Sequence, residues 1–169
     1  DGNFTGIEII DASTASASAT ISLANQGENY SILGSIHADV LTGGRGDDKF
    51  IGFAGADNVH GGAGTDTLVL TATSATFNAV SDGNFTGIEI IDASTASAST
   101  TISLASQGEN YSILGSIYAD TITGGGGDDT IAGGQGADEL DGGSGADTFS
   151  YLSTSETGNL TASGSDRIN

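Results

Sequence analysis

A nine-residue period constrains the fold of this chain more than any other feature of its sequence. Residues 34–69 read GSIHADVLT, GGRGDDKFI, GFAGADNVH and GGAGTDTLV, and residues 115–150 read GSIYADTIT, GGGGDDTIA, GGQGADELD and GGSGADTFS. Each row has an aspartate in the sixth place and an apolar residue in the eighth. The aspartates are Asp39, Asp48, Asp57, Asp66, Asp120, Asp129, Asp138 and Asp147, and the apolar residues are Leu41, Phe50, Val59, Leu68, Ile122, Ile131, Leu140 and Phe149. Such a period predicts a stack of similar turns.

The nonapeptides lie within a longer tandem repeat, in which residue 82 is the counterpart of residue 1. Residues 1–48 and 82–129 differ at only six of 48 aligned positions. This near-identity indicates a recent tandem duplication, which is typical of solenoids, spacers and adhesive stalks. We expect a first unit at 1–81, a second at 82–162, and the start of a truncated C-terminal segment at 163–169. Because the chain starts and stops within the pattern, without an initiator Met or a basic, apolar leader, we interpret it as part of a longer protein.

Composition excludes several classes of partner. The chain has 22 acidic residues against 3 Lys and Arg, and a formal net charge of −19. This charge disfavours nucleic acid and anionic lipid and favours cations. With no cysteine, neither disulfides nor thiolate zinc sites are available. No apolar run approaches the roughly 20 residues of a membrane span. An oxygen-coordinated ion or packing alone must hold the chain together.

The nonapeptide can be interpreted place by place. Its first six residues, rich in glycine, can turn tightly and point carbonyl groups inward, and its last three alternate as a short strand with one buried side chain. Two nonapeptides then make one coil, and coils stack with parallel strands. Stacked turns bring carbonyl oxygens and two carboxylates together. This hard-oxygen cage suits Ca²⁺ better than Mg²⁺, which gives up its waters reluctantly.

These rows resemble the RTX (repeats-in-toxin) nonapeptide GGxGxDxUx, which forms a calcium-binding, right-handed parallel β-roll. In that family one turn supplies its second and fourth carbonyls and its aspartate, and the turn two nonapeptides later supplies its first and third carbonyls and its aspartate. The resemblance implies four Ca²⁺ sites: Ser35, His37 and Asp39 with Gly52, Ala54 and Asp57; Gly44, Gly46 and Asp48 with Gly61, Ala63 and Asp66; Ser116, Tyr118 and Asp120 with Gly133, Gln135 and Asp138; and Gly125, Gly127 and Asp129 with Gly142, Ser144 and Asp147.

Some rows depart from the family pattern. The rows that begin at Gly34 and Gly115 place Ser second and His37 or Tyr118 fourth, where the pattern has glycine. The preceding segments NQGENYSIL and SQGENYSIL carry Tyr30 and Tyr111 in place of the aspartate. We expect these segments to coil without a full pair of carboxylates.

The stretch between the blocks leaves two arrangements open. GIEIIDAS, at 6–13 and 87–94, predicts a buried strand followed by an Asp-led turn. If every nonapeptide-length step were half a coil, each unit would make four and a half coils, and equivalent residues of the two units would lie on opposite faces of a continuous rod of about nine coils. Alternatively, the Thr/Ser-rich stretch uses longer coils or forms a separate β-layer, which would reset the phase.

The sequence lacks the motifs of zinc proteases, serine hydrolases and P-loop proteins. HExxH, GxSxG and GxxxxGK[ST] are absent from the sequence. His37 is Tyr118 in the duplicate and His60 corresponds to Asp141, so we interpret both histidines as surface or turn residues. Paired acids such as Asp47 and Asp48 raise the alternative of a glycosidase. The period instead makes the second acid the ligand and the first a variable fifth-place residue.

Three functional interpretations remain. The tandem units favour a calcium-dependent structural module of a large secreted adhesin or exoprotein that folds outside the cell. The tail SDRIN resembles the segment after the roll in serralysin-type proteases and alginate epimerases, which favours the non-catalytic C-terminal roll of a secreted protease, lipase or epimerase. A third interpretation makes the Thr-bearing faces a surface for polysaccharide or ice. The resemblance implies type I secretion, an extracellular or cell-surface location, and contact with polysaccharide or a cell surface through other domains of the parent chain.

Overall fold

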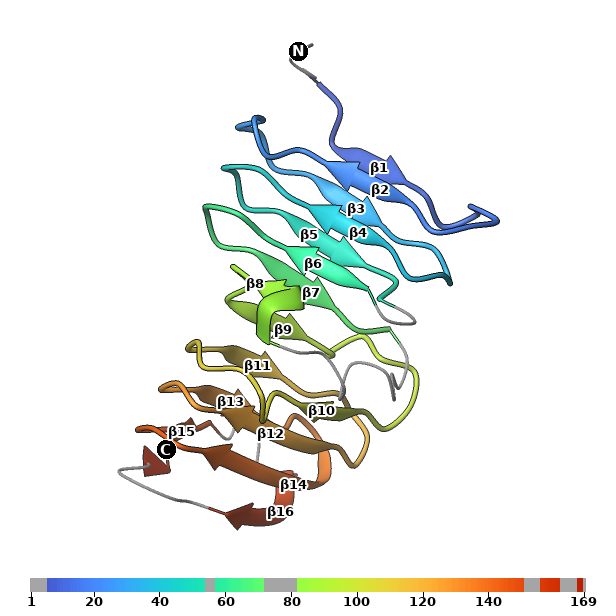
Figure 1. Cartoon of the computed structure of the whole chain (residues 1–169). Helices are drawn as coiled ribbons and strands as arrows, with labels where there is room; N and C mark the ends of the chain where they lie inside the picture. Colours follow the sequence, from blue (N-terminus) through green and yellow to red (C-terminus); the bar gives the residue numbers. More distant parts are fainter. Residues whose placement is uncertain (1–5, 54–56, 72–81, 151–155, 162–166, 169) are drawn as a thin grey trace.

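The strands of the computed structural model stack into a parallel β-solenoid, described for residues 6–53, 57–71, 82–150, 156–161 and 167–168 (Figure 1). One face is a continuous sheet of β1 (Ile9–Asp11), β3 (Ser31–Leu33), β5 (Lys49–Ile51), β7 (Thr67–Val69), β9 (Ile90–Asp92), β11 (Ser112–Leu114), β13 (Thr130–Ala132), β15 (Thr148–Phe149) and β17 (Arg167–Ile168), in that order. The other face holds two sheets: β2 (Thr20–Ser22), β4 (Val40–Thr42), β6 (Asn58–His60) and β8 (Phe85–Thr86), then β10 (Thr101–Ser103), β12 (Thr121–Gly125), β14 (Gly136–Gly143) and β16 (Glu156–Thr161).

Helical structure in the described ranges is limited to the short 3-10 helix η2 (Asp82–Asn84), before β8. No helix in these ranges is long and apolar enough to cross a membrane. The all-β, parallel architecture predicted from the nonapeptides is confirmed.

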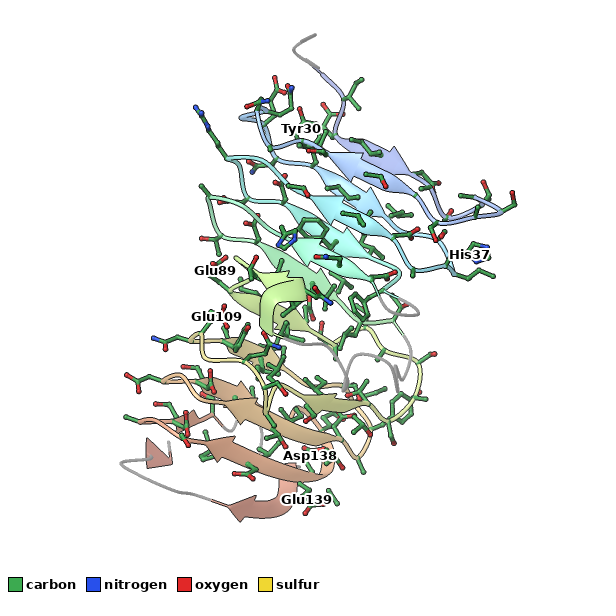
Figure 2. The ribbon with its side chains drawn as sticks, viewed as in Figure 1. Tyr30, His37, Glu89, Glu109, Asp138 and Glu139 are labelled. Carbon is green, nitrogen blue, oxygen red and sulfur yellow. The ribbon has the colours of Figure 1, made fainter. Side chains whose placement is uncertain are left out.

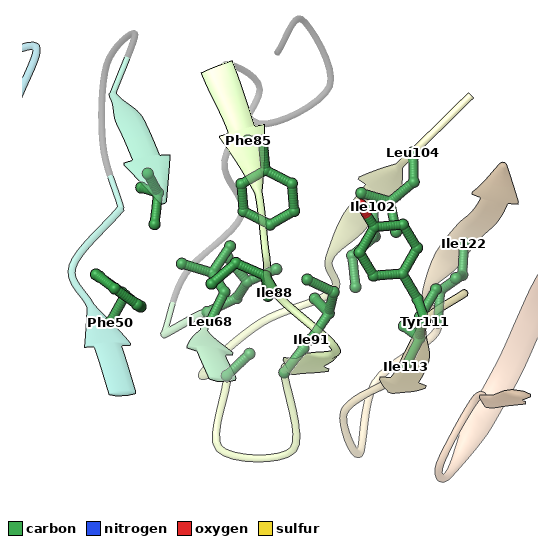
Figure 3. Packing of buried hydrophobic residues seen from close by; sticks show 14 of the residues in the cluster. Phe50, Leu68, Phe85, Ile88, Ile91, Ile102, Leu104, Tyr111, Ile113 and Ile122 are labelled. Carbon is green, nitrogen blue, oxygen red and sulfur yellow. The ribbon is translucent and has the colours of Figure 1, made fainter. Parts of the chain in front are cut away.

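The core is a double row of apolar side chains between the two faces (Figure 3). Most strands are three residues long, so the middle side chain points inward while its neighbours point outward. All eight apolar residues predicted from the eighth place of the nonapeptide are buried: Leu41, Phe50, Val59, Leu68, Ile122, Ile131, Leu140 and Phe149. Ile32, Ile91, Ile102 and Ile113 extend the same rows through the segments outside the nonapeptide blocks.

The coils differ in length, which resolves the phase of the two units. Along the continuous sheet, Leu68 pairs with Ile91, Ile91 with Ile113, Ile113 with Ile131, and Ile131 with Phe149. Two long steps and two short steps thus lead from Leu68 to its counterpart Phe149, so each unit makes four coils.

The prediction of four and a half coils per unit, which would give about nine coils and place equivalent residues on opposite faces, is thus wrong. The alternative, in which the Thr/Ser-rich stretch uses longer coils, is confirmed. Asp48 and Asp129, which precede β5 and β13, lie along the same edge of the same sheet. In the coil from Ile91 to Ile113 the extra length lies in the turns. Residues 93–100 and 104–111 form eight-residue connections, whereas the glycine-rich connection 61–66 needs only six residues.

Two glycines in the connection 61–66 have backbone angles that other residues rarely adopt. Gly62 and Gly64 have φ angles of +113° and +131°. The connection 43–48 is equally short without any residue of positive φ, so these angles do not by themselves separate the short turns from the long ones.

The GIEIIDAS segments form strands followed by Asp-led turns, as expected, but the predicted burial holds only for the second strand. They form β1 and β9, and the turns that follow are led by Asp11 and Asp92, whose carboxylates accept hydrogen bonds from the amides of Ser13 and Ser94 at 2.8 and 2.9 Å. Ile91 at the centre of β9 is buried, whereas Ile10 in the first coil is only half-buried. The same strand is therefore well covered only where coils stack on both sides.

An aromatic pair packs where the second face is interrupted. β8 and β10 lie in separate sheets, because β8 pairs with β6 and β10 pairs with β12. The rings of Phe85 and Tyr111 stack there with centroids 6.3 Å apart and planes inclined by 25° (Figure 3). Offset aromatic stacking supplies packing where the hydrogen-bonded ladder is absent.

Substitution of the central residue of a strand should destabilise the solenoid. Ile113 is 0% exposed, whereas Ile117, in the next turn, is 58% exposed. We expect Ile113→Ala to lower the free energy of unfolding by about 2–5 kcal/mol, because it leaves a cavity in the double row. Ile117→Ala should change it by no more than about 0.5 kcal/mol. Urea unfolding in saturating calcium measures both values, and equal losses would contradict the described core.

Candidate metal centre

The eight sixth-place aspartates form the centre of the candidate site. All of them are buried: Asp39, Asp48, Asp57, Asp66, Asp120, Asp129, Asp138 and Asp147 are exposed by 0–4%. Each one immediately precedes a strand or lies within one, so the sheet holds its backbone in place. Aspartate is rarely buried without a partner, because removing a carboxylate from water is costly.

The aspartates stack in ladders along the solenoid. The amide of each earlier aspartate donates to Oδ1 of the aspartate 18 residues later: Asp39 to Asp57 at 2.8 Å, Asp48 to Asp66 at 2.7 Å, Asp120 to Asp138 at 2.9 Å and Asp129 to Asp147 at 2.8 Å. These are the four pairs predicted from the nonapeptide period. The structure therefore brings the members of each predicted pair together.

Carboxylate and carbonyl oxygens converge between the turns. A Cβ atom placed on Gly43 would lie 2.5 Å from Asp48 Oδ2 and against the carbonyl oxygen of Gly61. On Gly124 it would lie against Asp129 Oδ2 and 2.6 Å from the carbonyl oxygen of Gly142. The two sites whose first row has serine in the second place, which we call the outer sites, repeat this arrangement. Asp39 Oδ2 and the carbonyl oxygen of Gly52 lie beside Gly34, and Asp120 Oδ2 and the carbonyl oxygen of Gly133 lie beside Gly115. Two oxygen ligands predicted for one ion thus meet at one point, which suits Ca²⁺.

Some of these oxygens lack any hydrogen bond. Asp66 Oδ2 and Asp129 Oδ2 are buried and accept none within the described part of the chain. Burial raises the pKa of Asp66 to about 6, and the neighbouring Asp48 and Glu89 carboxylates add to this rise. Burial also raises the pKa of Asp129 to about 6, with a further contribution from Asp147. A divalent cation would supply the missing partner and the missing positive charge.

The predicted second-place ligands are placed in the turns as follows. The carbonyl oxygens of Gly44, Ser116 and Gly125 each accept an amide hydrogen bond from the third-place residue of the later turn, Ala63, Gln135 and Ser144 respectively. Each carbonyl oxygen keeps a second lone pair. The serines also tie down the carboxylates, since Ser35 Oγ and Ser116 Oγ donate to Asp39 Oδ1 and Asp120 Oδ1 at 3.0 and 3.1 Å. Serine in the second place is therefore compatible with the turn.

The fourth-place residues also face the later turn. The carbonyl oxygens of Gly46 and Gly127 lie against Gly64 and Gly145. A Cβ atom on Gly136, whose φ is +128°, would lie 2.7 Å from the carbonyl oxygen of Tyr118. The amides of His37 and Tyr118 donate to the hydroxyl groups of Ser35 and Ser116 at 3.1 and 3.0 Å. The remaining predicted ligand, Ala54, lies outside the described residues, and the complete ligand set stays a prediction.

A second ladder, on the exposed side of the turns, involves the fifth-place acids, whose structural role the nine-residue period does not predict. Asp47 and Asp128 are exposed, yet their Oδ1 atoms accept hydrogen bonds at 2.8 Å from the amides of Thr65 and Ala146. Asn29 and Asn110 accept the amides of Asp47 and Asp128 in the same way, at 2.9 and 2.8 Å. An uncharged asparagine can therefore perform this role.

The ladders continue beyond the nonapeptides. The amides of Tyr30 and Tyr111 donate to Asp48 Oδ1 and Asp129 Oδ1 at 2.8 and 2.7 Å, so these segments do coil with a single carboxylate, as predicted. Glu89 extends the ladder after Asp66 and was missed, because it lies 23 residues later and breaks the nine-residue count. Its position directly before an apolar strand is the signal that could have identified it.

Among the described residues, no cluster of three or more His, Asp or Glu side chains is close enough to hold a metal ion. The candidate sites instead combine pairs of carboxylates with backbone oxygens. Comparison with protein families gives a match to the RTX calcium-binding nonapeptide repeat, in four copies, at residues 33–68 and 114–149. The chain carries RTX calcium-binding nonapeptide repeats. Neither the curated proteins nor the solved structures gave a match.

RTX repeats bind Ca²⁺, and the two matched stretches contain all eight buried aspartates. The RTX β-roll is typically a non-catalytic module, which agrees with turns built from aspartates and backbone groups. Calcium bound there would neutralise the stacked carboxylates and join consecutive turns.

Neighbouring aspartates allow a matched test of the ladder. Asp129→Asn should weaken calcium binding at its site at least tenfold, because it removes a buried carboxylate and keeps an acceptor for the amide of Tyr111. Asp128→Asn should leave the affinity within about twofold, since asparagine preserves the hydrogen bond of the second ladder and the lost charge is exposed. Isothermal titration calorimetry measures both variants, and equal losses would show that the ligand register is wrong by one residue.

The calcium-free chain should gain structure on acidification. The pKa values of Asp66 and Asp129 are about 6 in the folded state, above the ordinary value of 3.8. Between these values the folded state binds more protons than the unfolded chain, so stability is lost as the pH rises through about 6. We expect more strand signal in chelator at pH 5 than at pH 7.5, measured by circular dichroism. The double variant with Asp66→Asn and Asp129→Asn should show a smaller change, and a strand signal that rises with pH would contradict the account.

Proposed function

We propose that this chain is a calcium-dependent structural module of a large secreted RTX protein, which folds when it meets Ca²⁺ outside the cell. The module consists of two tandem units, 1–81 and 82–162, and the start of a further segment at 163–169. The parent protein is a surface adhesin or another exoprotein, exported by type I secretion, and the module itself performs no catalysis.

The observation that carries this proposal is the burial of eight aspartates in stacked pairs. Within each pair the amide of the earlier aspartate donates to the carboxylate of the later one, while the whole chain has only three Lys and Arg residues. A buried carboxylate costs several kcal/mol unless it is paired and hydrogen-bonded. The backbone amides meet part of this demand, and calcium supplies the remaining charge. Folding and calcium binding are therefore coupled.

The proposed ligands are those of the four predicted sites. In each site the two aspartates and four carbonyl oxygens of the stacked turns provide six oxygens, within the coordination number of six to eight that calcium accepts. Two pairs, Asp48 with Asp66 and Asp129 with Asp147, lie in the rows whose residues match the family consensus most closely. The outer pairs use serine in the second place, where its hydroxyl group holds the carboxylate.

Two sequence features bear on the parent protein. The near-identity of residues 1–48 and 82–129 supports a repetitive adhesin or exoprotein, since such arrays extend by duplication. The SDRIN tail supports the alternative, a non-catalytic C-terminal roll of a secreted protease, lipase or epimerase. The calcium-dependent role of the module is the same in both cases.

Removal of calcium should unfold the module at neutral pH. Four bound ions change the formal charge from −19 to −11, so the chelated chain is repelled into an expanded state. Extracellular calcium modules bind at about 10⁻⁴–10⁻³ M, so folding should occur in that range. Circular dichroism and small-angle scattering, in chelator and then in millimolar Ca²⁺, measure strand content and size.

Magnesium is the control for simple charge screening. We expect Mg²⁺ at the same concentration to leave the chain expanded, because it keeps its waters and demands octahedral geometry. A compact, strand-rich chain in chelator at neutral pH would contradict the proposal, and so would equal compaction by both ions.

A further inference from the structure

The junction between the first nonapeptide block and the second unit contains features of a metal site that do not follow the nonapeptide pattern. The last turn of the block, residues 61–66, is followed along the continuous sheet by Gly87, Ile88 and Glu89, which lead into β9. Figure 2 shows Glu89 on the edge of the solenoid that also carries Tyr30 and Glu109, whereas His37 lies at the opposite edge. This is the edge along which Asp48 and Asp66 stack.

The register across the junction matches the register within the block. The amide of Asp66 donates to Glu89 Oε2 at 2.8 Å, as the amide of Asp48 donates to Asp66 Oδ1 at 2.7 Å. Likewise the amide of Gly61 donates to the carbonyl of Thr86 at 2.9 Å, as the amide of Gly43 donates to the carbonyl of His60 at 2.8 Å. Gly87 therefore takes the place of a first-place glycine, and Glu89 takes the place of a sixth-place aspartate.

Three residues thus replace the usual six at this turn. The longer glutamate side chain compensates for the shorter backbone, since its carboxylate still reaches the amide of Asp66. Ile88 between them is buried, so the shortened turn is packed against the core.

The oxygens at the junction converge as they do in the predicted sites. A Cβ atom on Gly61 would lie 2.5 Å from Asp66 Oδ2 and against the carbonyl oxygen of Gly87. The equivalent point beside Gly43 is bounded by Asp48 Oδ2 and the carbonyl oxygen of Gly61.

One of these oxygens, Asp66 Oδ2, is buried without a hydrogen bond among the described residues. Asp66 is 0% exposed, and its Oδ2, which points to the convergence with Gly87, accepts no hydrogen bond in the part of the chain described. Asp48 Oδ2, in contrast, accepts the amide of Gly44 at 2.6 Å. A buried, unpaired carboxylate oxygen beside a carbonyl oxygen and a second carboxylate calls for a cation.

We propose that a fifth calcium ion binds between the two units, held by the carboxylates of Asp66 and Glu89 and the carbonyl oxygen of Gly87. This inference rests on the proposed calcium-dependent function and adds a site outside the nonapeptide consensus. Asp66 bridges this ion and the ion of the Asp48–Asp66 pair. The site has fewer turn carbonyls than the others, so waters complete its coordination and its affinity is lower. The ion joins the two tandem units into one solenoid.

The tandem duplication supplies a matched control for the test. Glu8 is the counterpart of Glu89 in the first unit and is exposed. Glu89→Gln removes one negative charge and keeps an acceptor for the amide of Asp66, and Glu8→Gln makes the same chemical change away from the junction. Native mass spectrometry, after equilibration of the whole chain with calcium, counts the bound ions in each protein.

We expect five ions in the wild type and in Glu8→Gln, and four in Glu89→Gln, with circular dichroism unchanged. A second variant, Glu89→Asp, should also lose the fifth ion, because its shorter side chain cannot reach the amide of Asp66. Four ions in the wild type, or five in Glu89→Gln, would overturn the fifth site and leave the proposed function intact. A wild type that binds no calcium would overturn both.

Discussion

The hydrogen bond between the amide of one aspartate and the carboxylate of the aspartate 18 residues later is the contact on which this solenoid depends. It fixes the register between turns, because the sixth-place side chain of each turn is the one that reaches the amide of the turn before. The same bond places carboxylates in a column, where their repulsion would separate the turns. The stacked aspartates therefore fix the register of the turns and, at the same positions, require cations to offset their negative charge.

Shorter and longer coils differ in whether their turns contain the stacked aspartates. The shorter coils have six-residue, glycine-rich turns that bring carbonyl oxygens within reach of the aspartates. The longer coils have eight-residue turns and place Tyr30 or Tyr111 where the aspartate would stand. The tyrosines are buried and their hydroxyl groups donate to Glu28 and Glu109, so hydrogen bonds within the protein hold these turns. Turns with stacked aspartates and turns without them thus alternate along the solenoid.

The sequence alone predicted the parts of the structure that follow a strict period. The buried aspartates, the eight apolar residues of the nonapeptides and the pairing of every second turn all follow from a spacing that leaves one turn geometry possible. The phase between the units could not be obtained in this way, because turn length in the Thr/Ser-rich stretch depends on how eight-residue connections pack. The role of Glu89 could not be predicted from the sequence either, because its alignment with Asp66 depends on the register between β7 and β9. The hydrogen bonds of Asp47 and Asp128 likewise depend on stacking between coils.

The central claim is that ions, and not protons, neutralise the buried aspartates at neutral pH. The most direct measurement is anomalous diffraction from crystals of the whole chain grown in calcium and then exchanged with terbium. The account predicts anomalous peaks between Asp48 and Asp66, between Asp129 and Asp147, and between the two outer pairs, each within bonding distance of two carboxylates. Peaks confined to exposed acids such as Asp47 and Asp128, with no ion between the stacked aspartates, would contradict it.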